Sequence, residues 1–149
     1  MNTFDKFALA ERAEQVFAEV YGLLARQFAQ EPKYHALFTR LEQEEIQHAM
    51  RIKMLRKRYV TMGKDMKELV LEIAPLQAFL KQGETTRQRL AAGETLGTVT
   101  EVVARIAELE RQLAGAHAEM ILAVGDASLR NFFKKLAAQD RGHAALLCQ

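Results

Sequence analysis

The feature that most constrains this chain is a carboxylate and an imidazole within the apolar stripe of one long predicted helix, Tyr34 to Met62. Apolar residues recur there in steps of three and four, at Phe38, Leu41, Ile52, Leu55, Tyr59 and Met62. The same steps fall on Glu45 and His48, which lie side by side on a helix and reach one inward point. Because burying charge is costly without compensation, the pair predicts a metal site. The competing interpretation is a shifted register, with Glu45 solvated like its neighbours Glu42 and Glu44.

The same spacing occurs a second time near the end of the sequence. Asp140 and His143 repeat it 95 residues later, and the apolar residues four and seven positions before Asp140 match those before Glu45. The preceding helices also match, at an offset of 96 residues, with Glu14 and Tyr21 in the first copy and Glu110 and His117 in the second. These offsets predict a duplicated unit of two helices.

Length and composition favour one soluble, globular, all-α domain over residues 1–149. Hydrophobic residues make up 49% of the chain, but no apolar run approaches the roughly eighteen residues of a membrane span. The N-terminus lacks the apolar core of a signal peptide, so we expect a cytoplasmic protein without a membrane partner. The single cysteine, Cys148, excludes an intramolecular disulfide and a Cys-x-x-Cys metal site. A net charge of +2 gives no indication of a nucleic-acid partner.

The periodic stripes predict four main helices in two antiparallel hairpins. The first hairpin joins a helix from about Thr3 to Ala29 to the Tyr34–Met62 helix through a short connection at Pro32. The second joins a helix from about Thr98 or Thr100 to Val124 to a helix that continues to the C-terminus. Packing of the two hairpins gives a four-helix bundle.

Residues 63–97 are predicted to form a long crossover between the hairpins. This segment contains Pro75 and the glycines at 83 and 93, which indicate interruptions. We expect only short helices here, one bearing the apolar residues from Met66 to Ile73 and another over Leu76 to Lys81.

The hairpins bring six ligand-type side chains to one level near the middle of the bundle, namely Glu14, Glu45, His48, Glu110, Asp140 and His143. Four ionised carboxylates at close range repel one another unless cations neutralise them, and two divalent ions would cancel their charge. Oxygen-rich ligation with one imidazole per metal and no thiolate favours iron or manganese, with zinc as an alternative occupant.

This pattern resembles the ferritin-like di-iron proteins, and among them rubrerythrin. The resemblance covers all four main helices and implies a ferritin-like bundle in which the six residues hold two irons that react with peroxide or dioxygen. Three departures bear on function. The four cysteines of a rubredoxin-like domain are missing, which implies a separate electron donor, and Leu113 stands where rubrerythrin has a second glutamate. Asp140 replaces the usual glutamate and is shorter by one methylene, so we expect one of the two metal positions to be weaker.

Tyr21 and His117 occupy matching positions, each seven residues after an expected ligand, Glu14 or Glu110, and in the same helical stripe. Tyr21 is predicted to donate a hydrogen bond to a ligand carboxylate. For His117 two roles are open, a core histidine hydrogen-bonded to a ligand or a direct metal ligand.

The leading functional hypothesis is a di-iron oxidoreductase that reduces peroxide or dioxygen. The main alternative is an iron- or zinc-binding or regulatory protein without turnover, which docks to a partner through the basic end of the Tyr34–Met62 helix. Iron storage would require a closed shell of subunits, and monooxygenation would require an apolar pocket beside the metals. A homodimer is compatible with each of these functions, and the sequence does not separate them.

Overall fold

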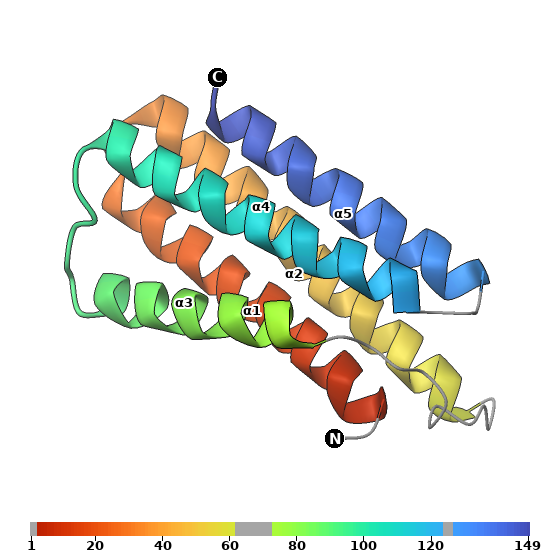
Figure 1. Ribbon diagram of the computed structural model, residues 1–149. Helices are drawn as coiled ribbons and strands as arrows, with labels where there is room; N and C mark the ends of the chain where they lie inside the picture. Colours follow the sequence, from red (N-terminus) through yellow and green to blue (C-terminus); the bar gives the residue numbers. More distant parts are fainter. Residues whose placement is uncertain (1–2, 62–72, 124–126) are drawn as a thin grey trace.

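The computed structural model describes residues 3–61, 73–123 and 127–149, and every regular element in these ranges is an α-helix (Figure 1). The helices are α1 (Thr3–Gln27), α2 (Pro32–Thr61), α3 (Ala74–Ala91), α4 (Val99–Ala123) and α5 (Ala127–Leu147). The prediction of an all-α protein is confirmed. None of these described helices is both long and apolar enough to cross a lipid bilayer.

The closest backbone packing is within two hairpins, α1 on α2 and α4 on α5. Pro32 begins α2, at a position where its missing N–H has no helical acceptor to lose. The backbone N–H groups of Tyr34 and His35 donate to the carbonyl of Glu31 at 3.1 and 2.9 Å, which forms the first turn of α2. The His35 side chain joins this turn to the end of α1, because its Nδ1 lies 2.8 Å from the carbonyl oxygen of Ala25.

The described part of the crossover differs from the expectation, because it contains a helix of 18 residues rather than a short piece over Leu76 to Lys81. The expected piece from Leu76 to Lys81 lies within α3, and the piece expected from Met66 falls largely outside the described residues. Gly83 does not interrupt α3. A Cβ atom at Gly83 would lie 3.2 Å from Cγ1 of Val16, so the missing side chain allows α3 to pack closely against α1. The helix ends before Gly93, whose φ of 84° suits glycine.

Helix α3 packs against α1 and also contacts α4, so it spans the two hairpins on one side (Figure 1). Phe79 of α3 is 1% exposed and meets the ring of Phe17 edge-on, with ring centroids 5.4 Å apart. Such a contact adds directional aromatic attraction to the burial of apolar surface. α3 is therefore part of the hydrophobic core, although it contributes no ligand-type side chain to the centre described below.

Aromatic side chains lie on both sides of a polar layer in the core. This polar layer consists of the buried residues Glu14, Glu45, His48, Glu110, His117, Asp140 and His143. Phe7 of α1 and Phe133 of α5 stack with centroids 5.9 Å apart, and Phe133 also lies against the ring of His117. Towards the other end, Tyr21 and Phe38 stack with centroids 6.3 Å apart. These rings exclude water from the polar layer between them, so charges in that layer interact in a low dielectric.

We predict that Phe79→Ala lowers the free energy of unfolding by about 3–5 kcal/mol, because it leaves a cavity between α3 and α1. Gln77→Ala, an exposed change in the same helix, should stay within about 0.5 kcal/mol of wild type. Urea denaturation followed by circular dichroism measures both variants. Equal stability of the two variants would contradict the packing of α3 into the core.

Candidate metal centre

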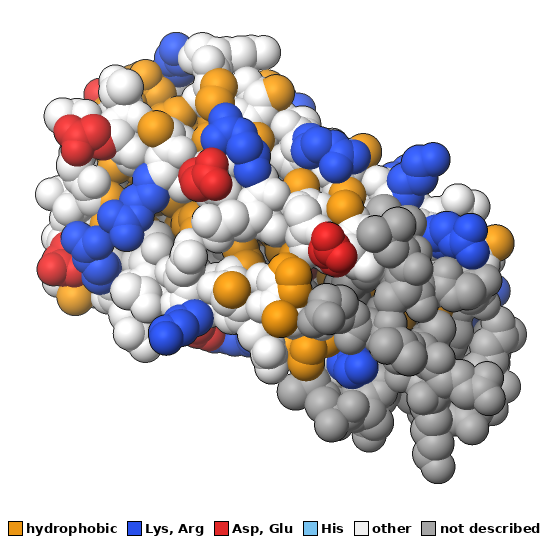
Figure 2. Space-filling view, viewed as in Figure 1, with side chains coloured by type: hydrophobic (Ala, Val, Ile, Leu, Met, Phe, Trp, Pro, Cys, Tyr) orange, Lys and Arg blue, Asp and Glu red, His pale blue; other side chains and the backbone are white. Residues whose placement is uncertain are grey.

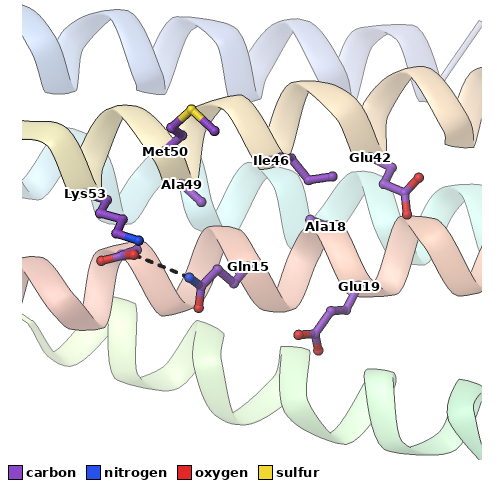
Figure 3. A pocket seen from close by; sticks show the side chains of 9 residues that line it. Gln15, Ala18, Glu19, Glu42, Ile46, Ala49, Met50 and Lys53 are labelled. Carbon is purple, nitrogen blue, oxygen red and sulfur yellow. Dashed lines mark hydrogen bonds between the residues drawn. The ribbon is translucent and has the colours of Figure 1, made fainter.

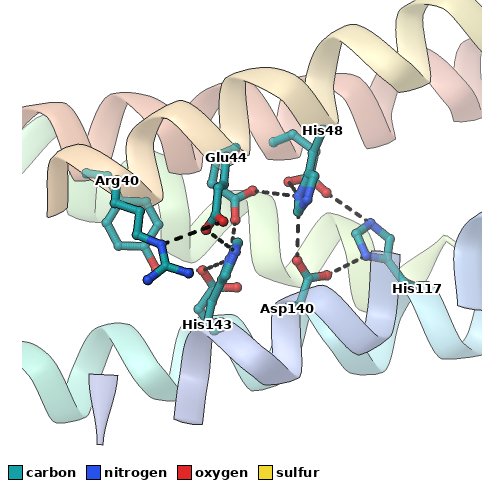
Figure 4. A network of polar contacts seen from close by, with 10 residues as sticks. Arg40, Glu44, His48, His117, Asp140 and His143 are labelled. Carbon is teal, nitrogen blue, oxygen red and sulfur yellow. Dashed lines mark hydrogen bonds and ion pairs between the residues drawn. The ribbon is translucent and has the colours of Figure 1, made fainter. Parts of the chain in front are cut away.

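The structure brings together all six ligand-type residues that the sequence places in helix stripes. They come from four helices: Glu14 from α1, Glu45 and His48 from α2, Glu110 from α4, and Asp140 and His143 from α5. Each is at most 5% exposed. Figure 4 shows His48, His117, Asp140 and His143 turned towards one another across the core. In the space-filling view of Figure 2, no histidine atoms are visible on the face shown.

The ligand-type atoms form two overlapping sets. One contains Glu14, Glu45, His48 and Asp140, and the other contains Glu45, Glu110, Asp140 and His143. Within each set, one ligand-type atom per residue lies within 4.8 Å of every other. Glu45 and Asp140 belong to both sets, so the shorter side chain of Asp140 still reaches both groups. The two repeated motifs thus supply two similar groups that could each hold a metal ion, and both groups include Glu45 and Asp140.

The two imidazoles lie close to the carboxylates through their Nδ1 atoms. Nδ1 of His143 is 2.9 Å from Oε1 of Glu45 and 3.2 Å from Oε1 of Glu110. Nδ1 of His48 lies further out, 3.7 Å from Oε2 of Glu14 and 3.6 Å from Oε2 of Glu45. The rings themselves stack with centroids 5.6 Å apart. Both histidines therefore present the same nitrogen to the shared carboxylates.

Several polar atoms of this cluster are buried without a hydrogen-bond partner. They include both carboxylate oxygens of Glu14, Oε2 of Glu45, Oε2 of Glu110, Oδ1 of Asp140 and Nδ1 of His48. A buried carboxylate oxygen without a donor loses its hydration and gains no hydrogen bond, which costs about 1–3 kcal/mol, and more for a charged group. Divalent cations would satisfy these atoms. The residues present can therefore hold metal ions.

Protonation distributes the charge of the cluster when no cation neutralises it. Burial and the neighbouring charge of Glu45 raise the pKa of Glu14 to about 8. Burial opposes ionisation of Glu45 as well, but close polar contacts with Glu14, His143 and His48 lower its pKa to about 2. This tightly coupled pair therefore favours retention of a proton between the two carboxyl groups. Burial together with the charge of Glu45 also raises the pKa of Glu110 well above its ordinary value.

The two histidines are protonated in the same state. Burial disfavours their charge, but contact with Glu14 and Glu45 raises the pKa of His48 to about 10. Burial likewise opposes the charge of His143, whose contacts with Glu110 and Glu45 raise its pKa to about 11. The metal-free cluster is thus a network of buried ion pairs and retained protons.

Tyr21 and His117 also contact carboxylates of this cluster. The hydroxyl of Tyr21 donates a hydrogen bond of 2.5 Å to Oε1 of Glu110. Nδ1 of His117 lies 2.6 Å from Oδ2 of Asp140, and its Nε2 lies 3.3 Å from Oε1 of Glu14. His117 belongs to neither four-residue set. Each residue is placed to fix the orientation of a carboxylate.

Sequence reasoning missed Glu44. It was expected to be a surface charge, but its side chain is 35% exposed and its Oε2 lies 2.9 Å from Nε2 of His143. The contact joins α2 to α5 and depends on how the two hairpins pack. The pattern of α2 alone carried no signal for it, because Glu44 lies beside the apolar stripe rather than within it.

A groove between α1 and α2, about 410 Å³ in volume, is separate from this cluster (Figure 3). Its walls combine Ala18, Ile46, Ala49 and Met50 with charged and polar side chains, among them Glu19, Glu42 and Lys53. None of the six ligand-type residues lines it. This groove therefore does not provide the apolar pocket beside the metals that monooxygenation would require.

No protein-family model, no curated protein and no solved structure matches this chain.

We predict that the stability of the metal-free protein falls as the pH rises from 6 to 10. Glu14, His48 and His143 bind protons more tightly in the folded state than in the unfolded chain, because their folded pKa values are raised to about 8, 10 and 11. That stabilisation is complete below the ordinary pKa values, 4.5 for the glutamate and 6.5 for the histidines. It is lost as the pH rises from those values to the folded pKa values. Each differing proton contributes about 1.4 kcal/mol per pH unit.

Urea denaturation at a series of pH values measures this dependence. The zinc-loaded protein should not show the decline, since metal ligation requires deprotonated ligands and strengthens as the pH rises. Glu14→Gln should make the decline of the metal-free protein shallower between pH 6 and 8. A flat profile for metal-free wild type would contradict the buried proton network.

Proposed function

We propose that this chain is a ferritin-like dinuclear metal protein and that it acts as an oxidoreductase on peroxide or dioxygen. The observation that carries the proposal is the pair of overlapping ligand sets, buried in the core and sharing Glu45 and Asp140. The two hairpins, the duplicated motifs and the resemblance to rubrerythrin support a ferritin-like arrangement of α1, α2, α4 and α5. The proposed native ions are two irons, with manganese or zinc as alternatives.

The donor atoms fit this choice of metals. Two divalent cations would balance four carboxylates, and each set also supplies one imidazole. Hard carboxylate oxygens with a single imidazole and no thiolate suit iron or manganese better than a structural zinc site, which usually contains cysteine. The unpartnered carboxylate oxygens of Glu14, Glu45, Glu110 and Asp140 would all gain a cation as partner.

The residues of the chain have distinct roles in this proposal. Glu14 and His48 would hold one ion, and Glu110 and His143 the other, with Glu45 and Asp140 shared between them. Tyr21 orients Glu110, and His117 orients Asp140. Bound in the ferrous state, two such ions would supply the electrons for reduction of peroxide or dioxygen. We propose that a separate protein or a small reductant restores those electrons.

One observation favours a second candidate, a protein that binds iron or zinc without turnover. Every ligand-type residue is at most 5% exposed, and none of the six lines the groove between α1 and α2. A substrate larger than peroxide or dioxygen would have little access to such a centre. Regulation by metal binding requires no such access.

We predict that the protein isolated from iron-supplemented cells carries one to two metal ions per chain by elemental analysis. Removing them should lower the melting temperature, because the ions bind only the folded state. Anaerobic ferrous protein mixed with peroxide should oxidise much faster than free ferrous iron at the same concentration. Stoichiometric metal without faster oxidation would favour the binding protein, and absence of metal would refute the proposal.

We predict that Glu45→Ala or His48→Ala reduces bound metal to below one ion per chain. Both side chains belong to the ligand sets, and removing Glu45 affects both sets. Glu42→Ala is the matched control on α2, since Glu42 lines the outer groove and lies beside Gly22. It should leave the metal content unchanged. Equal loss of metal from all three variants would show that the register of α2 has been misassigned.

A further inference from the structure

We propose that Glu44 is a positioning residue for His143, and that it makes the metal position formed by Glu110 and His143 the tighter of the two. This inference rests on the proposed dinuclear centre and assigns an order to the filling of its two positions. It is carried by an ion pair between α2 and α5 and by a difference between the two halves of the duplicated sequence.

The imidazole of His143 contacts acidic groups through both nitrogens. Nδ1 faces the centre, 2.9 Å from Oε1 of Glu45 and 3.2 Å from Oε1 of Glu110. Nε2 faces the opposite way and lies 2.9 Å from Oε2 of Glu44 (Figure 4). Nδ1 is therefore the nitrogen available to a metal, and Nε2 is the nitrogen that would keep its proton.

Glu44 is held on the side of His143 away from the centre. Its Oε2 atom is buried although the side chain as a whole is 35% exposed. Its other oxygen, Oε1, lies 3.8 Å from Nε of Arg40, one turn earlier on α2. Oε2 accepts no hydrogen bond of good geometry, so the contact with His143 is an ion pair. The 2.9 Å separation of Nε2 from Oε2 is short enough for a hydrogen bond once the N–H points at the oxygen.

A carboxylate in this place strengthens a histidine ligand. By accepting the N–H of Nε2, it fixes the tautomer in which Nδ1 carries the lone pair, and it makes that lone pair more basic. Loss of such a partner typically weakens metal binding by about 10- to 100-fold. Because Glu44 is one-third exposed, solvent screens its charge, and we expect an effect near the lower limit.

The other half of the chain has no carboxylate at the equivalent position. Glu44 immediately precedes Glu45, and the residue that immediately precedes Asp140 is Gln139. An amide oxygen is a neutral acceptor and forms weaker hydrogen bonds than a carboxylate. Oε1 of Gln139 is buried and has no hydrogen-bond partner. The position formed by Glu14 and His48 therefore lacks the support that Glu44 gives to His143.

The first experiment titrates the metal-free chain with zinc alone, in competition with a chromophoric chelator. Wild type should bind in two steps of different affinity. Glu44→Gln should weaken the tighter step about tenfold and leave the weaker step unchanged, whereas Glu44→Asp should restore part of the loss because it keeps the negative charge. Glu42→Gln, which neutralises a carboxylate of the same helix that lines the outer groove, should behave as wild type.

The second experiment locates the ion that binds first. Crystals of wild type grown with one zinc equivalent per chain should show stronger anomalous scattering beside Glu110 and His143. In the double variant Glu44→Gln with Gln139→Glu, the stronger peak should move to the position beside Glu14 and His48. A purely structural role of Glu44 would not reverse this order.

The outcomes separate this inference from the proposed function. If wild type binds no zinc, both are refuted. If wild type binds zinc but Glu44→Gln leaves both affinities unchanged, or weakens both steps equally, only the role of Glu44 is refuted. The melting temperature of the metal-free Glu44→Gln protein should match that of wild type, and a large decrease together with equal weakening would identify a folding effect and overturn the positioning role.

Discussion

Mutual repulsion among four buried carboxylates is the constraint on which the rest of this structure depends. Glu14, Glu45, Glu110 and Asp140 come from different helices and meet in a layer that aromatic rings shield from water. Solvent cannot screen their charge, so the charge must be neutralised by protons, by His48 and His143, or by cations. The metal-free network achieves this only partly, because several oxygens keep no hydrogen-bond partner. The same feature that destabilises the metal-free fold would drive metal binding.

The apolar core offsets the cost of this polar layer. Stacked and edge-on aromatic rings join α1 to α5, α1 to α2 and α1 to α3. Helix α3 is important here because it packs on α1 and also contacts α4, although it supplies no ligand-type residue to the centre. This packing holds the ligand-type atoms of each set within 4.8 Å of one another, which suits a metal ion. Without it, the side chains would move apart and become hydrated.

The two halves of the duplicated chain are similar where they supply ligands and different where they support them. Each half contributes one carboxylate from its first helix, and a carboxylate and histidine pair from its second. At other matching positions of the two halves the residue types differ. Tyr21 corresponds to His117, and Glu44 corresponds to Gln139. A tyrosine hydroxyl donates to Glu110, whereas an imidazole contacts both Asp140 and Glu14. The two ligand sets are thus similar in composition, but the residues that contact them differ.

The sequence by itself determined the helical class, the approximate ends of α1, α2, α4 and α5, and the residues that face the core. This is possible because the 3.6-residue period of a helix assigns each side chain to a face before any tertiary contact forms. It did not reveal that α3 continues through Gly83, because only the approach of Val16 explains a glycine there. Nor did it reveal the contact between Glu44 and His143, or that the shorter Asp140 still belongs to both ligand sets. Those depend on distances between helices, which are set by packing and are not encoded in the period of any single helix.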